Sequence, residues 1–478
     1  MFNILKNILL LNFLRSLIKR DLIKYPTPKN LTYFWNYGSL AGLFLAIQLI
    51  TGFLLTLHYM ASIDMAFNCI ESIMKDLNYG WLLRYMHSNG ASFFFITIYI
   101  HIIKAFHFTS YLYPRHILWS SGVIIFILSM GAAFLGHVLP WGQMSYWAAT
   151  VITNLITVLP YFGNDLVYWV WGGYNINSNT LSRFYSLHFI LPFVITLMVI
   201  YHLYELHIVG SSNYLNNSLI SLDKINFFPY FIIKDLFGLL LLILLFINLF
   251  SFNPEYLSHT DNYIPADPLV TPAHIVPEWY FLAFYAILRS ILDKLYGIIF
   301  MGLSLGGLLL LPFIVDKSVK NVSFSYTDYV INMSLIIIFI YLSIMGVAFP
   351  ISPFIEVGCI LAHALLLFYF LIIPLSSNLY NNIYFENNTN NVSYVNITNK
   401  FTYIKKIIFF LFCSFFLYFF LKEYIFGICF DIASNMKEYD QINERAILFI
   451  KQTDKTASTL IEKYFSFNSE NKGSLFIS

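Results

Sequence analysis

Four histidines form two equally spaced pairs within long apolar segments of the chain. His87 and His101 lie in one segment and His188 and His202 in another, and 14 positions separate the members of each pair. In an α-helix 14 residues make nearly four turns, so the two histidines lie on almost one face, ~21 Å apart along the axis. If the two helices are parallel, His87 faces His188 and His101 faces His202. The spacing therefore predicts two sites at different depths, each with two imidazoles.

Two facing imidazoles suit a heme iron with both axial positions filled, which favours electron transfer over oxygen binding. Zinc would need more ligands than each level offers, and the chain has no C-x-x-C-H motif for covalent heme attachment. The alternative is ordinary hydrogen bonding by histidines inside a helix bundle. Ionisable groups within a membrane are costly and mark functional sites. We therefore predict two b-type hemes, with iron bound by His87/His188 and by His101/His202.

Glycines and cationic side chains near these levels are further candidates for heme contacts. In two other apolar segments, four glycines repeat the 14-residue spacing: Gly38 and Gly52, and Gly122 and Gly136. A glycine at each of these positions would let a flat macrocycle approach the backbone. Small-residue helix packing is the alternative explanation. Heme propionates would be met by Arg84 and Arg183 near the pair His87/His188, called the outer pair below. Lys104 would meet them near the pair His101/His202, called the inner pair. Snorkelling interfacial charges are the alternative for these three.

The elements that must position these residues are membrane-spanning helices. Of the 478 residues, 58% are hydrophobic and only 11% are charged, against about a quarter charged in soluble domains. A spanning helix needs ~20 apolar residues. Eight segments qualify, at about 35–58, 80–106, 116–138, 182–206, 229–250, 288–312, 328–348 and 352–374. The predicted fold class is an all-α polytopic membrane protein whose first four helices form a heme-binding bundle.

The distribution of charge predicts the orientation of the chain. Lys and Arg are concentrated before the first span and after spans two, four and six, whereas the other loops are acidic. By the positive-inside rule the N-terminus lies on the matrix or cytoplasmic side. The second and fourth spans then run in the same direction. The net charge of +2 without dense basic runs argues against a nucleic-acid partner.

The chain resembles the mitochondrial cytochrome b family over roughly residues 25–380. The matching runs are Trp35-Asn36-Tyr37-Gly38-Ser39-Leu40, Arg84-Tyr85-Met86-His87, Leu139-Pro140-Trp141-Gly142-Gln143-Met144-Ser145 and Pro277-Glu278-Trp279-Tyr280. The equal spacing within both histidine pairs resembles that of the respiratory members. Photosynthetic relatives have one more residue between the two histidines of the second pair. The resemblance implies the electron-transfer subunit of a quinol–cytochrome c oxidoreductase (complex III, the cytochrome bc1 complex). It implies the mitochondrial inner membrane, a bacterial plasma membrane being the alternative.

The resemblance also implies an outer site for ubiquinol oxidation between the segments 140–146 and 277–280. There Glu278 would accept a proton from its place in the first turn of a helix begun by Pro277, an ordinary helix-start acid being the alternative. One electron would go to a Rieske iron–sulfur protein and on to a cytochrome c1-type subunit, and the other through the two hemes. The implied quinone-binding residues of this site are Tyr146, Ala148, Pro277, Tyr280 and Tyr285.

At an inner site the second electron would reduce quinone and contribute to proton translocation. His207 and Asp235 would hydrogen-bond and protonate the two quinone oxygens, with Ser39 and Lys234 beside them. An interfacial polar pair is the alternative for His207 and Asp235. The family further implies other complex III subunits and a homodimeric complex.

Four regions follow from this assignment. They are an amphipathic interfacial segment (1–34), the heme-binding bundle with its outer loop helices (35–228), helices that contribute to the quinone sites (229–380), and an extension with a polar tail (381–478). Within the extension, residues 403–421 either form a ninth spanning helix or lie at the interface.

Three residues depart from the family pattern. Ala148 stands where members usually carry glycine, so its methyl group should crowd the outer quinone pocket. His137 replaces a usual tyrosine beside the same pocket. Lys104 replaces a usual arginine, which loses bidentate contact with a propionate but keeps the charge.

Two other functions compete with this interpretation. A di-heme membrane anchor of another quinone-linked dehydrogenase would also pair histidines, but it needs neither eight spans nor the run 277–280. A proton-coupled transporter could use the histidines as a relay, yet a relay requires no 14-residue register, and the sequence lacks the repeated halves common in transporters.

Overall fold

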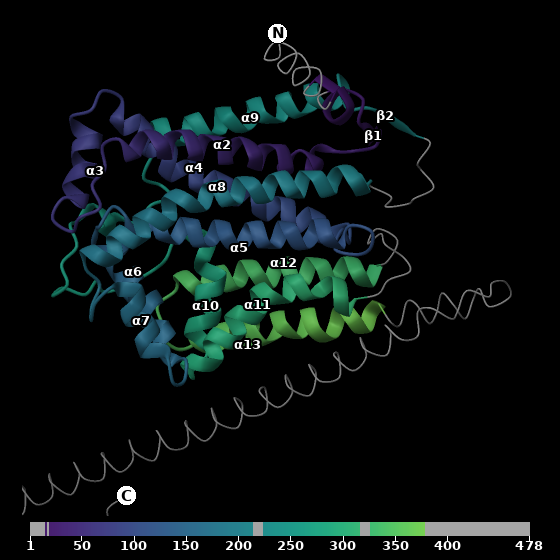
Figure 1. The fold of residues 1–478 in the computed structure, drawn as a ribbon. Helices are drawn as coiled ribbons and strands as arrows, with labels where there is room; N and C mark the ends of the chain where they lie inside the picture. The colour runs from purple at the N-terminus through teal and green to yellow at the C-terminus, as the bar shows by residue number, and fades with distance from the viewer. Residues whose placement is uncertain (1–14, 17–18, 214–222, 316–325, 378–478) are drawn as a thin grey trace, which may run out of the picture. The chain divides into compact units, whose positions relative to one another are not determined.

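The computed structural model describes residues 15–16, 19–213, 223–315 and 326–377, and most of these residues are helical (Figure 1). Within these ranges, eight helices are long and apolar enough to cross a membrane, which confirms the predicted fold class. They are η2 with α2 (Tyr33–Thr56), α4 (Gly80–His107), α5 (His116–Val138), α8 (Ser178–Val209), α9 (Tyr230–Phe252), α11 (Lys294–Ile314), α12 (Tyr326–Val347) and α13 with its extension (Phe354–Ser377).

The first four spanning helices form two closely packed pairs. Helix α2 (Tyr37–Thr56) packs along α4, and α5 packs along α8. Helix α9 packs on both α2 and α4 (Figure 1). The two histidine-bearing helices, α4 and α8, run in the same direction, because the earlier histidine of each helix lies at one level and the later at the other. This is the arrangement that the spacing requires.

Short helices gather at the end of the bundle that carries His87 and His188. They are α3 (Ala66–Lys75), α6 (Gln143–Asn154), η3 (Leu155–Val158), α7 (Gly163–Trp171) and η5 (Thr260–Tyr263). Gly163 starts α7 where an added Cβ would meet the carbonyl oxygens of Ile156 and Thr157, at 2.6 and 2.8 Å. Glycine therefore permits the tight turn from η3 into α7.

Two short helices, η6 (Trp279–Phe281) and α10 (Leu282–Ser290), precede the sixth spanning helix. Helix α11 starts at Lys294 rather than near the predicted position 288, because α10 and α11 are separate helices. Asp293 caps α11 by accepting hydrogen bonds from the backbone N–H groups of Leu295 and Tyr296, at 2.8 and 3.1 Å. The predicted sixth span therefore begins several residues too early.

Helices α12 and α13 (Phe354–Leu367), with η8 (Phe368–Ile372), complete the second half of the chain, and both α12 and α13 pack on α10. At the far end of the bundle, a two-stranded antiparallel ribbon pairs β1 (Pro26–Pro28) with β2 (Lys224–Asn226). The short π-helix η1 (Lys19–Ile23) precedes β1. Residues 1–14 and the extension from 381 to 478, with the proposed ninth helix at 403–421, lie outside the described residues.

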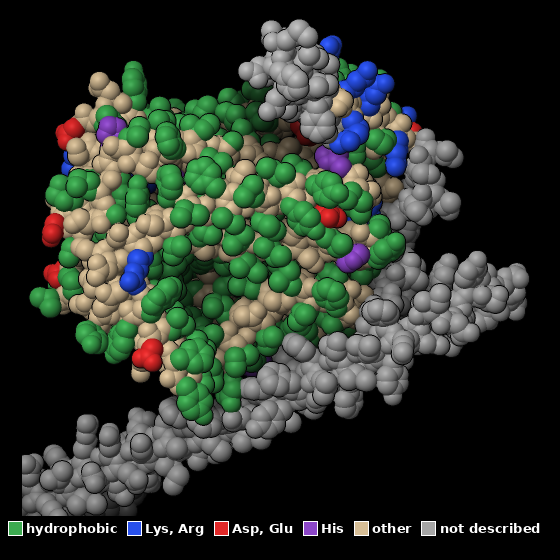
Figure 2. Space-filling view, viewed as in Figure 1, with side chains coloured by type: hydrophobic (Ala, Val, Ile, Leu, Met, Phe, Trp, Pro, Cys, Tyr) green, Lys and Arg blue, Asp and Glu red, His purple; other side chains and the backbone are tan. Residues whose placement is uncertain are grey.

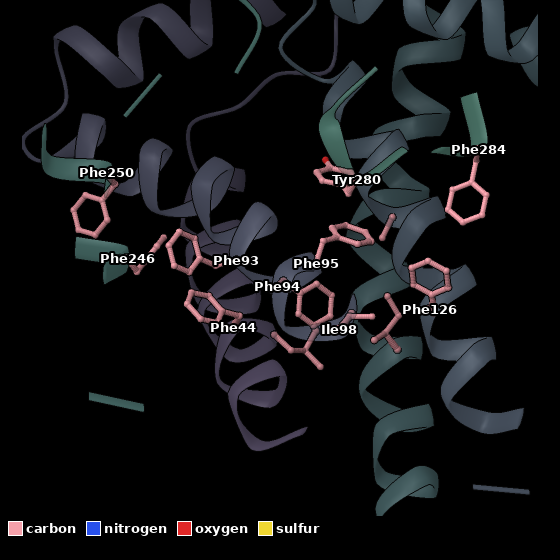
Figure 3. Packing of buried hydrophobic residues seen from close by; sticks show 13 residues of the cluster. Phe44, Phe93, Phe94, Phe95, Ile98, Phe126, Phe246, Phe250, Tyr280 and Phe284 are labelled. Atoms are coloured by element: carbon pink, nitrogen blue, oxygen red, sulfur yellow. The ribbon is translucent and has the colours of Figure 1, made fainter. Parts of the chain in front are cut away.

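Aromatic side chains fill the interior between the two halves of the chain (Figure 3). Phe44, Phe93 and Phe246 join α2, α4 and α9, with ring centres 5.1 to 5.4 Å apart. Phe95 of α4 stacks on Tyr280 of η6 at 4.1 Å. The cluster therefore fixes the segment around 277–281 against a histidine-bearing helix.

The surface shows the pattern of a membrane protein. On the face drawn in Figure 2, hydrophobic side chains cover the middle, and most of the visible Lys and Arg side chains gather near the β1–β2 end. Helices α8 and α9 expose many large apolar side chains, among them Leu197, Ile200, Leu241 and Leu245. In water such a surface would be unfavourable, so it is expected to face lipid.

Candidate heme and quinone sites

The four histidines meet in pairs, as their spacing predicts. The ring centres of His87 and His188 lie 6.3 Å apart, and those of His101 and His202 lie 6.4 Å apart. A ligating histidine nitrogen lies ~2 Å from its metal and ~1 Å from the centre of its own ring, so two imidazoles on opposite sides of one iron have centres ~6 Å apart. Both pairs therefore have the separation that one axially ligated iron requires.

Hydrogen bonds at Nδ1 orient three of the four rings. Thr51 Oγ1 lies 2.9 Å from Nδ1 of His87, and Ser121 Oγ lies 2.8 Å from Nδ1 of His202. The Nδ1 atom of His188 lies 2.7 Å from the carbonyl oxygen of Ala132. Such bonds fix the ring and leave Nε2 for a metal. The Nδ1 atom of His101 is buried and has no hydrogen-bond partner among the described residues.

Each of the four equally spaced glycines lies against one histidine ring. A Cβ added at Gly38 would lie 3.3 Å from His101, one at Gly52 3.0 Å from His87, and one at Gly122 3.1 Å from His202. A Cβ at Gly136 would overlap the ring of His188. The glycines therefore make room for the imidazoles themselves, whereas the sequence suggested only the macrocycle.

A cavity of about 650 Å³ opens beside the outer pair. Its lining includes His87, His188, Arg84 and Glu278. Arg84 is thus placed where a propionate partner is expected. Arg183 lies elsewhere: it is exposed and donates a hydrogen bond to the carbonyl oxygen of Trp169.

Lys104, the cation expected at the inner level, lies over the ring of Trp35, with Nζ 4.6 Å from the ring centre. It is on α4, three residues after His101. Its side chain is therefore close to the inner pair, and its contact with a propionate stays a prediction.

Hydrogen bonds join the segment 140–146 to the loop that leads to the segment 277–280. Asn262 Oδ1 accepts a bond from the backbone N–H of Ser145 at 2.9 Å, and Gln143 Nε2 donates to the carbonyl oxygen of Val270 at 3.0 Å. Residues of both segments, Pro140, Glu278 and Tyr280 among them, line the same cavity. The loop that leads to Glu278 is therefore fastened to the start of α6.

The position of Glu278 relative to the helix differs slightly from the prediction. It is the N-cap residue of η6, with extended backbone dihedrals, and not a member of the first turn. Its carboxylate makes no capping hydrogen bond there. Instead, Oε1 lies 3.2 Å from Nδ1 of His137.

The other residues expected at this site are not among the residues that line the cavity; they are Tyr146, Ala148, Pro277 and Tyr285. Ala148 is only 4% exposed on α6, and Tyr146 packs edge-on against Trp141 with ring centres 5.7 Å apart. Tyr285 donates a hydrogen bond of 3.1 Å to the carbonyl oxygen of Ile275, in the loop before Pro277. Their part in binding a quinone stays a prediction.

At the inner end, Ser39 and Asp235 lie within range of each other. The hydroxyl of Ser39 donates a hydrogen bond of 2.8 Å to the carbonyl oxygen of Asn36. Lys234, the neighbour of Asp235 on α9, donates from Nζ to the carbonyl oxygen of Leu31 at 2.5 Å. His207 lies at the end of α8, where its ring contacts Tyr25 edge-on at 4.7 Å. Asp235 and His207 are therefore presented by two different helices, α9 and α8.

Hydroxyl groups that the sequence did not predict at these sites hydrogen-bond to two of the histidine rings. Thr51 precedes Gly52 and Ser121 precedes Gly122, so a hydroxyl residue directly before a spaced glycine was the available signal.

Two residues of α4 that were not predicted from the sequence hold the segment around Glu278. Ser92 Oγ accepts a bond of 3.1 Å from Trp279 Nε1, and Tyr99 donates one of 2.5 Å to the carbonyl oxygen of Tyr280. No pattern in the sequence marks these bonds, because their partners lie more than 180 residues away along the chain.

The chain is similar to known proteins over most of its length. Residues 22–210 match the family model described as cytochrome b/b6/petB, and residues 265–370 match cytochrome b(C-terminal)/b6/petD. The cytochrome b of Phytophthora megasperma is 51% identical over 72% of this chain and 90% of its own length, and that of Acanthamoeba castellanii is 47% identical over 75% and 92%. A solved structure titled "Hyperthermophilic respiratory Complex III" aligns with a TM-score of 0.73 and 32% identity over 77% of this chain and 97% of its own chain. The chain belongs to the cytochrome b family.

Proposed function

We propose that the chain, as the electron-transfer subunit of a respiratory complex III, oxidises quinol at the outer site. The observation that carries the proposal is the pair of histidine sites with ring centres 6.3 and 6.4 Å apart, one of which opens on the cavity lined by Glu278. When bound, two b-type hemes supply one-electron redox centres at the two depths. His87 and His188 would hold one heme, and His101 and His202 the other.

Some residues of the outer site bind the quinol, and one accepts its proton. The segments 140–146 and 277–280 hold the quinol ring in a cavity that also contains the outer histidine pair. Glu278 accepts a proton as quinol is oxidised, since its carboxylate lies in the cavity wall and makes no capping bond. Tyr146, Ala148, Pro277, Tyr280 and Tyr285 give the pocket its shape.

At the inner end, Asp235 and His207 would deliver protons to the two oxygens of a quinone, with Ser39 and Lys234 beside them. The partners of the chain would be a Rieske iron–sulfur protein and a cytochrome c1-type subunit, in a dimeric complex with further subunits. We assign the complex to the mitochondrial inner membrane, with ubiquinone as its substrate and the N-terminus of the chain on the matrix side.

Quinol–cytochrome c reductase activity of the purified complex tests the proposal. Replacement of Glu278 by Gln keeps the size of the side chain and removes the proton acceptor, so turnover should fall while the heme content stays at the wild-type value. Replacement of the exposed Glu356 of α13 by Gln is the control and should leave turnover unchanged. Equal activity of E278Q and the wild type would contradict the assigned role.

A further inference from the structure

His137 and Glu278 form an ionisable pair in the wall of the outer cavity. Nδ1 of His137 lies 3.2 Å from Oε1 of Glu278, and the two side chains are only 12% and 18% exposed. Both residues line the cavity. Because a proton can pass directly between two groups at this separation, the histidine is within reach of any proton that Glu278 receives.

Separate elements hold the two partners in place. His137 is in the last turn of α5, which ends at Val138, and its carbonyl oxygen accepts a hydrogen bond of 2.7 Å from the hydroxyl of Ser145. The C-terminal end of a helix and a neighbouring carboxylate both favour a positive charge. Within the described part of the chain, Nε2 of His137 is buried and has no hydrogen-bond partner.

We propose that His137 takes over the proton that Glu278 accepts from quinol, an inference that rests on the function proposed above. A quinol O–H bond breaks and an O–H bond forms at Glu278; that bond then breaks as an N–H bond forms at Nδ1 of His137. No electron moves in the second step. The net charge of the pair changes from −1 to zero, and the proton is held in an imidazolium–carboxylate ion pair instead of a carboxylic acid.

Other titratable groups line the same cavity. They are Tyr59, Glu71, Lys75, Arg84, Tyr85, His87, Tyr185, His188, His259, Tyr263 and Tyr280. Burial and the charge of Glu278 raise the pKa of Tyr280 well above its ordinary value, so its hydroxyl stays protonated and does not compete for the proton. The guanidinium of Arg84 lies within electrostatic range of Glu278.

The test uses the purified complex with His137 replaced by Tyr, Phe or Gln, none of which can hold the proton. Infrared difference spectroscopy during quinol oxidation follows the C=O band of a protonated carboxyl group, and E278Q assigns it. We expect the band in all three variants and its absence in the wild type. His58, exposed at the same end of the bundle, provides the control H58Q, which should behave as the wild type.

The pH profile of turnover gives a second measurement. In H137F the pH profile of turnover should differ from that of the wild type, because the group that takes the proton from Glu278 is absent. A wild-type band as strong as that of H137F, or an unmoved profile, would overturn the inference while quinol oxidation remained intact. A wild-type complex with both hemes but no quinol oxidation would instead contradict the proposed function.

Discussion

Ser121 Oγ lies 2.8 Å from Nδ1 of His202, so a hydroxyl of α5 holds a ligand ring of α8. The same relation joins Thr51 of α2 to His87 of α4 at 2.9 Å. In both cases the hydroxyl residue directly precedes a glycine against which the ring rests. One short stretch of helix thus sets both the position and the hydrogen bond of the imidazole.

Replacement of Ser121 by Ala should weaken heme binding at the inner level about 10- to 100-fold, the usual effect of losing a hydrogen bond to a metal-ligating histidine. Heme retention on dilution measures the change. Ser120 is the matched control, because its hydroxyl donates to the carbonyl oxygen of His116 and S120A leaves the bond to His202 intact. Equal heme retention in S121A and S120A would contradict the orienting role.

Replacement of Gly136 by Ala should displace the ring of His188, because an added Cβ would overlap it. Overpacking of this kind costs about 1–3 kcal/mol. A potentiometric titration should then show a reduced or shifted outer heme component. Gly131 lies on the same helix, and among the described residues no atom comes within 4 Å of a Cβ added there. G131A should therefore titrate as the wild type, and a normal titration of G136A would count against the account.

Replacement of Ala148 by Gly should increase the potency of outer-site inhibitors that need glycine at this position. The alanine is only 4% exposed, and relief of a clash worth ~1.4 kcal/mol corresponds to about a tenfold gain in affinity. Inhibition curves of quinol oxidation measure the change. Ala149, which is fully buried on the same helix, supplies the control A149G. If the wild type is already as sensitive as A148G, Ala148 does not crowd the pocket.

The histidine pairs and the eight spans could be predicted because both depend on periodicity and length alone. A 14-residue interval fixes a face and a depth of a helix whatever the neighbours are, and an apolar stretch long enough to span is visible in the sequence. A parallel arrangement of the second and fourth helices is enough to predict that His87 faces His188.

The contacts of the outer site could not be predicted in the same way. The bond between His137 and Glu278 joins the end of α5 to a loop more than a hundred residues later, and its geometry depends on how Asn262 and Gln143 fasten that loop. The start of α11 was predicted too early because an apolar run continues almost to the break at Asp293. Hydropathy does not distinguish one helix from two in such a run.

A reduced-minus-oxidised spectrum of the purified complex, with a pyridine hemochrome count, tests the central claim most directly. We predict two b-type hemes per chain, with one lost when His202 is replaced by Leu. The absence of b-type absorbance would contradict the account and would favour a proton-relay transporter for these histidines.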